Sequence, residues 1–139
     1  MSGRTPIPVA WDREFWAYAG RGLLSAQRCH DCGWLQHYPK PVCGACLSEA
    51  LVFEPLSGRG RIYSFTTVRR PGDPSFLDQA PFTMLDVALD EGIRIISRLA
   101  DERDADHIAI GNEVHVVFVP TASGTPLPYF TKHSPRRSQ

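Results

Sequence analysis

The chain has 139 residues, of which 42% are hydrophobic, and its 15 lysines and arginines are balanced by 15 aspartates and glutamates. This length suits about one ordinary domain, and the even charge balance along the chain lacks the basic footprint of a nucleic-acid-binding protein. The sequence holds no run of roughly 20 apolar residues to cross a membrane and no apolar run of signal-peptide length near Met1, so we expect a cytoplasmic protein.

The first predicted element is a short helix over Trp11–Leu24, within an N-terminal helical segment of residues 1–28. Trp11 and Phe15 are four residues apart and share a helix face, and Trp16 lies beside them. One interpretation is that this apolar face covers the domain that follows. The other, which we favour, is that these three aromatics dock into a partner protein. The isolated chain would then self-associate, for example as a homodimer, and would fold without residues 1–22.

The zinc-ribbon segment, residues 29–50, contains all the cysteines of the chain in two Cys-x-x-Cys pairs: Cys29, Cys32, Cys43 and Cys46. Four thiolates form the tetrahedral shell that structural Zn²⁺ takes, and four protein ligands leave no open position for water. We therefore predict one structural zinc ion per chain. An iron centre on the same sulfurs is an alternative, as are disulfides, which need an oxidising compartment, and redox chemistry, which is expected from a single pair beside a βαβ unit.

The residues between the two cysteine pairs have two possible roles. Trp34 and Tyr38 fit an apolar cap over the metal, carried on a short hairpin. The alternative is a stacking platform for a nucleobase, and we prefer the cap because a small ribbon has few other apolar residues to cover it. His30 and His37 are predicted to be ordinary surface histidines because four sulfurs already satisfy the ion.

From residue 51 the pattern changes to short runs rich in β-branched and aromatic residues, which predict strands. About five strands in some eighty residues, without a long helix, predict a mainly β protein with a small five-stranded antiparallel OB-fold barrel over residues 51–131. The runs are Leu51–Leu56, Arg61–Arg70, Phe82–Asp90, Ile93–Ala100, Val114–Pro120 and Leu127–Thr131. Residues 101–107 are predicted to be an acidic connector, and residues 132–139 a flexible tail.

The clearest hairpin joins Phe82–Asp90 to Ile93–Ala100 through a turn at Glu91-Gly92. Strict alternation of apolar and polar residues predicts which side chains point into the core. The predicted inward residues are Thr83, Leu85, Val87, Leu89, Ile93, Ile95 and Leu99.

Several short motifs in this order resemble the DUF35 family over nearly the whole chain. The motifs are Phe15-Trp16, Leu23-Leu24, Gln27-Arg28-Cys29, the four cysteines, Gly58-x-Gly60, Tyr63-Ser64, Thr66, Pro81-Phe82, Leu89-Asp90-Glu91-Gly92 and Gly111-x-x-Val114. The resemblance implies an N-terminal helix, a rubredoxin-like zinc ribbon and an OB-fold.

If the resemblance carries function, the protein is a non-catalytic accessory subunit that binds and stabilises a thiolase-like, aldolase or hydratase partner. It would also help to hold the partner's CoA thioester. The family implies no catalytic residues, and the sequence offers none of its own, since the cysteines are committed to metal. The alternatives are a nucleic-acid-binding module, because zinc ribbons and OB-folds both serve that role, and, more weakly, an independent enzyme.

A CoA thioester needs cations for its phosphates. Arg69 and Arg70 end a predicted strand at the rim of the barrel, where guanidinium groups can grip phosphate with two hydrogen bonds. The plainer alternative is that these two arginines only solvate the end of the strand.

Overall fold

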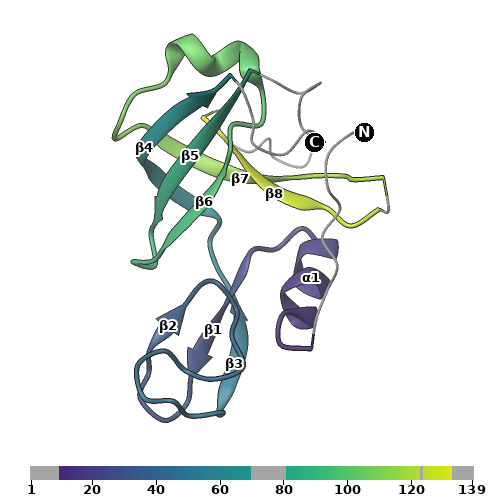
Figure 1. Cartoon of the computed structure of the whole chain (residues 1–139), viewed down its shortest axis with the longest axis vertical. Helices are drawn as coiled ribbons and strands as arrows, with labels where there is room; N and C mark the ends of the chain where they lie inside the picture. The colour runs from purple at the N-terminus through teal and green to yellow at the C-terminus, as the bar shows by residue number, and fades with distance from the viewer. Residues whose placement is uncertain (1–9, 70–80, 123, 133–139) are drawn as a thin grey trace.

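The computed structural model describes residues 10–69, 81–122 and 124–132. Within these residues the chain forms one α-helix, a three-stranded sheet and a five-stranded sheet. Figure 1 shows the helix and the smaller sheet at one end of the molecule and the larger sheet at the other. Over the described residues, the helices are all too short or too polar to cross a membrane.

The helix, α1, spans Arg13–Gly20 and begins after Asp12, inside the stretch predicted for it. Phe15 and Ala19, one turn apart, are its buried residues. They face the small sheet, because α1 lies against β1 (Ser25–Cys29) and β3 (Leu51–Pro55). The helix is therefore packed within the chain and does not project from it.

The small sheet is the zinc ribbon, with strand order β2-β1-β3 and β2 at Leu35–Gln36. Both pairings are antiparallel, and β1 lies in the middle with Cys29 opposite Leu51. Across the β1–β3 pair, a guanidinium nitrogen of Arg28 lies 3.0 Å from a carboxylate oxygen of Glu54. The sequence predicts residue 51 onwards in the barrel, but the structure pairs Leu51–Pro55 with β1 of the ribbon.

The five-stranded sheet has the order β6-β5-β4-β7-β8, with antiparallel pairing throughout. Its strands are β4 Arg59–Val68, β5 Phe82–Leu89, β6 Arg94–Arg98, β7 Glu113–Val119 and β8 Leu127–Thr131. A parallel bridge between Leu99 and Phe130, with a 2.8 Å hydrogen bond from Ala100 N–H to the Phe130 carbonyl, nearly closes the sheet into a barrel. This confirms the predicted barrel.

One local feature differs from the expectation, and two others shape strand β4. The acidic connector forms a 3-10 helix, η2, at Glu102–His107. Strand β4 pairs with β5 along its length and with β7 at its start, and an irregularity between Ile62 and Ser64 bends it. Glycine is required at residue 60, because a Cβ there would lie 2.5 Å from the Ala88 carbonyl oxygen.

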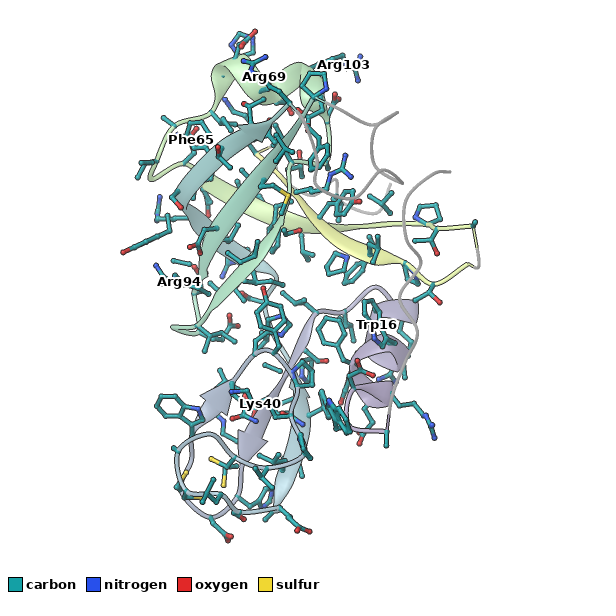
Figure 2. The ribbon with its side chains drawn as sticks, in the orientation of Figure 1. Trp16, Lys40, Phe65, Arg69, Arg94 and Arg103 are labelled. Carbon is teal, nitrogen blue, oxygen red and sulfur yellow. The ribbon has the colours of Figure 1, made fainter. Side chains whose placement is uncertain are left out.

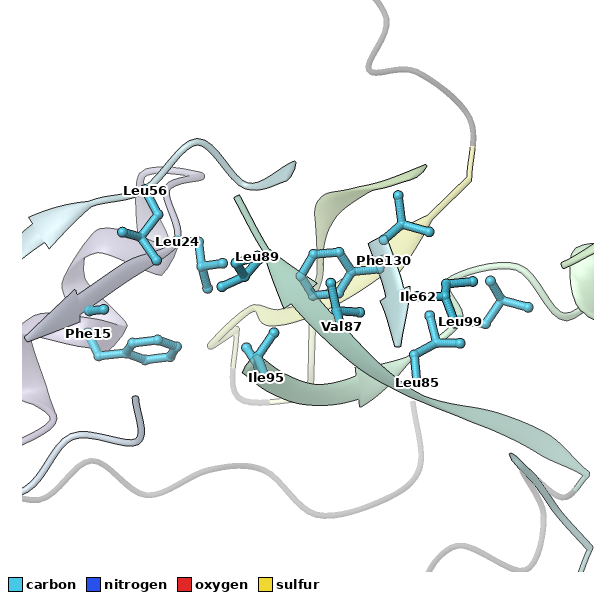
Figure 3. Packing of buried hydrophobic residues seen from close by; sticks show 12 residues of the cluster. Phe15, Leu24, Leu56, Ile62, Leu85, Val87, Leu89, Ile95, Leu99 and Phe130 are labelled. Carbon is cyan, nitrogen blue, oxygen red and sulfur yellow. The ribbon is translucent and has the colours of Figure 1, made fainter. Parts of the chain in front are cut away.

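One hydrophobic core runs from the helix through the ribbon into the barrel. Figure 3 shows Phe15, Leu24 and Leu56 next to Leu89 and Ile95 of the barrel, in one continuous cluster. The predicted inward residues of the hairpin are buried, except Ile93, which is half-buried. Helix, ribbon and barrel therefore share a core, and each depends on the others for its apolar cover.

A candidate metal centre and the pocket beside it

The first cysteine pair lies in a tight turn at the end of β1. The N–H of Cys29 donates to the Trp34 carbonyl (2.8 Å), and the N–H of Gly33 donates to the Cys29 carbonyl (2.9 Å). Gly33 has φ 80°, a left-handed conformation that glycine adopts without steric cost. This turn brings the sulfurs of Cys29 and Cys32 to the same side.

The second pair repeats this turn. The N–H of Cys43 donates to the Ser48 carbonyl (2.8 Å), and the N–H of Leu47 donates to the Cys43 carbonyl (2.9 Å). Leu47 takes the place that Gly33 has in the first turn and has φ 66°. It is also 74% exposed, so the strained conformation is not compensated by burial of its side chain.

The four cysteine sulfurs face one another, and all lie within 4.8 Å of each other. Cys29 Sγ is 3.6 Å from Cys46 Sγ, and Cys32 Sγ is 3.6 Å from Cys43 Sγ. Sulfurs about 2.3 Å from a shared tetrahedral ion are about 3.8 Å apart, whereas a disulfide needs about 2.05 Å. The four thiols are free, and their spacing fits a zinc ion better than disulfides.

The protonation of these thiols also fits a cation. Burial raises the pKa of Cys43, but hydrogen bonds from the backbone N–H groups of Cys46 and Ala45 lower it to about 7. At Cys46 a backbone hydrogen bond from Ser48 lowers the pKa, but the Cys32 sulfur and burial together raise it to about 12. Four sulfurs this close cannot all be ionised without a positive charge between them, and Zn²⁺ supplies one.

Two buried glutamines hold the second cysteine turn against β1, and the sequence analysis missed them. Gln36 Nε2 donates to Gln27 Oε1 (2.8 Å), while Gln36 Oε1 accepts from the N–H of Gly44 (2.9 Å). Gln27 exchanges two hydrogen bonds with the backbone of Lys40 (2.8 and 2.9 Å). The sequence held one signal for this role: Gln27 comes shortly before the first cysteine and Gln36 shortly after the first turn, and neither is a metal ligand.

The predicted apolar cap over the metal is not formed by Tyr38. Its side chain reaches away from the ribbon, and its hydroxyl accepts a 3.0 Å hydrogen bond from the backbone N–H of Ile96 on β6. Trp34 is largely exposed. The sequence could not reveal this partner, because Ile96 lies 58 residues away and meets Tyr38 only when ribbon and barrel pack together.

His37 is not the surface histidine that we expected. Its ring centroid lies 5.5 Å from that of Phe15 and 4.1 Å from that of Tyr38. Burial against these rings lowers the pKa of His37 to about 4. The side chain is therefore neutral at physiological pH, and it belongs to the junction between ribbon and barrel.

A pocket of about 330 Å³ lies at this junction. One wall comes from α1, another from residues 37–39 of the ribbon, and the third from the barrel strands β6 and β8 with Met84 of β5. Figure 2 shows Trp16 between α1 and the barrel, and Trp16 belongs to the lining of this pocket. Its lining is Asp12, Phe15, Trp16, His37, Tyr38, Pro39, Met84, Ile95, Ile96, Ser97, Arg98, Leu127, Pro128 and Tyr129.

The three aromatics predicted to dock a partner have different environments. Phe15 is only 5% exposed and belongs to the shared core. Trp16 is half-buried and packs edge-on against Phe15, with ring centroids 4.9 Å apart. Trp11 is 46% exposed. Of the predicted phosphate contacts, Arg69 is exposed directly after β4, and Arg70 lies outside the described residues.

Both halves of the chain match known domain models. Residues 16–52 match the model described as the rubredoxin-like zinc ribbon domain of ChsH2, and residues 53–119 match its C-terminal OB-fold domain. The solved structure titled Ltp2-ChsH2(DUF35) aldolase contains a chain with the same fold, at a TM-score of 0.79 and 28% identity. The match covers 91% of this chain and 98% of that one.

Two curated relatives extend the comparison. A DUF35 domain-containing scaffold protein of Methanothermobacter thermautotrophicus is 36% identical over 96 residues, which are 68% of this chain and 71% of that protein. A probable enoyl-CoA hydratase alpha subunit of Thermomonospora curvata is 31% identical over 126 residues. That match covers 90% of this chain but only 39% of the hydratase subunit. With its ribbon, its barrel and its four facing cysteines, the chain belongs to the DUF35 family.

Proposed function

We propose that this protein is a non-catalytic accessory subunit of an acyl-CoA-processing complex. It binds and stabilises a thiolase-like, aldolase or hydratase subunit and helps to hold the CoA thioester. The observation that carries the proposal is the match to nearly the full length of the DUF35 chain in the structure titled as an aldolase. The scaffold and hydratase names of the two curated relatives agree with it.

The cysteine chemistry supports a structural role for the metal. Zinc held by Cys29, Cys32, Cys43 and Cys46 has all four positions filled by protein, which leaves no place for a reacting water or substrate. When bound, the ion would hold the two cysteine turns together. These turns flank β2 and the segment with Tyr38, which contacts the barrel. The contribution of the ion is to folding, and the chemistry belongs to the partner.

The test is co-expression with candidate partners from the same genome, one from each of the three enzyme classes. We expect one class to form a complex that survives size-exclusion chromatography with light scattering, and we expect that enzyme to be less soluble or less active alone. If members of all three classes are fully active alone and none associates with this chain, the proposal is wrong.

Within that complex we assign partner contact to Trp11 and phosphate contact to Arg69 and Arg70. Trp11→Ala removes an exposed anchor and should weaken the complex without unfolding the chain. Arg69→Glu should weaken CoA binding by the complex, and Arg21→Glu, an equal charge change on an exposed residue next to α1, serves as the control. Equal CoA affinities of the two variants would contradict the role of Arg69.

A further inference from the structure

The pocket between helix, ribbon and barrel has the make-up of a small-molecule site. Its volume of about 330 Å³ is within the roughly 300–1,000 Å³ typical of ligand pockets. Its walls come from three separate parts of the chain, all tied into one core, so the pocket is formed before any ligand arrives. Neither the sequence motifs nor the metal centre accounts for it.

Rings surround this pocket. Phe15 and Trp16 come from α1, His37 and Tyr38 from the ribbon, and Tyr129 from β8. Phe15 and Trp16 are already held edge-to-face at 88°, and the rings of His37 and Tyr38 are held 4.1 Å apart. Fixed rings favour a ring in the ligand, because offset and edge-on aromatic contacts contribute beyond the burial of area alone.

The charges of the lining favour an uncharged group. Asp12 and Arg98 carry opposite charges, and Arg98 lies over the ring of Phe82 with its guanidinium carbon 4.1 Å from the centroid. His37 is half-buried, and its lowered pKa keeps it neutral at physiological pH. The pocket thus has no excess charge with which to hold an ionised group.

One polar group offers a specific contact. The Tyr38 hydroxyl accepts from the Ile96 N–H and keeps its own hydrogen for a further partner. Because this hydroxyl belongs to a residue of the pocket lining, it can donate to a carbonyl oxygen of the ligand.

The geometry points to the pocket as the binding site for a ring-bearing acyl group of a CoA thioester, with its carbonyl oxygen on the Tyr38 hydroxyl. This inference rests on the proposed function for the CoA thioester itself. The ring preference and the location come from the pocket.

The experiment compares three probes on the full chain and on its complex: free CoA, hexanoyl-CoA and phenylacetyl-CoA, by isothermal titration. Burial of a phenyl ring should tighten phenylacetyl-CoA over free CoA by at least about tenfold. Ring contacts should place it about 2- to 10-fold ahead of hexanoyl-CoA, which carries a linear acyl chain.

Two variants locate the site. Ile96→Trp fills the pocket from an exposed position on β6 and should bring the three affinities to the same value. Ile110→Trp makes the same change at an exposed residue outside the lining and should leave the ranking intact. Tyr38→Phe keeps the ring and should weaken both thioesters about fivefold while free CoA is unaffected.

The outcomes separate this inference from the proposed function. Equal binding of all three probes, in a complex that nevertheless forms, overturns the pocket assignment and leaves the accessory role standing. If Ile96→Trp disrupts the complex while the probes bind equally, the pocket receives a side chain of the partner and the inference is likewise wrong. A ring preference abolished by Ile96→Trp supports the inference even when no partner class associates, which would count against the proposed function alone.

Discussion

The hydroxyl of Tyr38, in the ribbon, accepts a 3.0 Å hydrogen bond from the backbone N–H of Ile96, on the barrel strand β6. The bond joins two residues 58 positions apart in the sequence. Ile96 is opposite Asp86 of β5 within the sheet, and β6 comes first in the strand order, so Tyr38 supplies a partner to a backbone N–H of an edge strand. The bond therefore links the ribbon to the barrel in addition to the core that they share.

Loss of one cysteine should release the metal and weaken more than the ribbon. Cys43→Ser leaves three sulfurs and a hydroxyl, so we expect zinc to fall from one ion per chain to well below that. Because Leu24 and Leu56 join ribbon and barrel in one core, the melting temperature should fall as well. Elemental analysis and thermal melting measure both effects. His30→Ala, at an exposed residue inside the first turn, is the control and should retain the metal. Iron absorption in fresh protein would contradict zinc.

Phe15 and Trp11 should behave oppositely when truncated. Phe15→Ala removes a 5%-exposed ring from the shared core and should cost about 3–5 kcal/mol of unfolding free energy. Trp11→Ala should change it by about 0.5 kcal/mol or less, because that residue is 46% exposed. Urea titration distinguishes the two. Deletion of residues 1–22 should therefore destabilise the protein. A stable, zinc-loaded truncation would restore the view that the helix serves only a partner.

Leu47→Gly should stabilise the protein. A leucine at φ 66° pays for a left-handed backbone that glycine adopts freely, and its exposed side chain contributes little packing in return. We expect a gain of about 0.5–1 kcal/mol in the zinc-loaded protein, measured by denaturant unfolding. The matched change Gly33→Ala, at φ 80° with no atom within 4 Å of the new Cβ, should lose about 1 kcal/mol. A destabilised Leu47→Gly protein would show that Leu47 makes contacts that offset its strain.

Stability should fall as the pH drops from about 6.5 to about 4 because of His37. Burial lowers the folded-state pKa of His37 to about 4, below its ordinary value of 6.5, so in this window the unfolded chain binds a proton that the folded chain does not. The contribution is complete above about pH 6.5, is lost as the pH falls towards 4, and amounts to no more than about 3 kcal/mol. His37 also lines a second pocket, between the ribbon and the turn that joins β5 to β6. The other titratable or charged groups that line these two pockets are Asp12, Tyr38, Lys40, Glu91, Arg94 and Arg98.

The measurement is unfolding free energy against pH for the natural chain and His37→Phe, with zinc content followed in parallel because acid also protonates the thiolates. The variant keeps a ring against Phe15 and Tyr38 but cannot titrate. Its pH curve should be flatter between pH 6.5 and 5. Parallel curves for the two proteins would show that His37 does not carry the effect.

The sequence by itself determined the metal ligands and the barrel strands. Two residues between paired cysteines bring both sulfurs of a pair to one turn, and two such pairs supply the four ligands Cys29, Cys32, Cys43 and Cys46. Strict alternation likewise fixes the faces of β5, where Thr83, Leu85, Val87 and Leu89 are buried as predicted. Both signals are local, since each depends on spacing within a few residues.

Only the tertiary structure decided which sheet each strand joins and which side chains are buried between helix, ribbon and barrel. Residues 51–55 have the composition of a strand, but the sequence does not say which sheet they join, and the structure pairs them with β1 of the ribbon. Phe15 has the same helical spacing whether it docks a partner or fills a core. The structure places it in the core cluster that also holds Leu89 and Ile95 of the barrel. His37 was predicted at the surface and Tyr38 in a cap over the metal, because the groups that they contact, Phe15 and Ile96, are far away in the chain. Burial depends on which surfaces meet, and local spacing does not encode that.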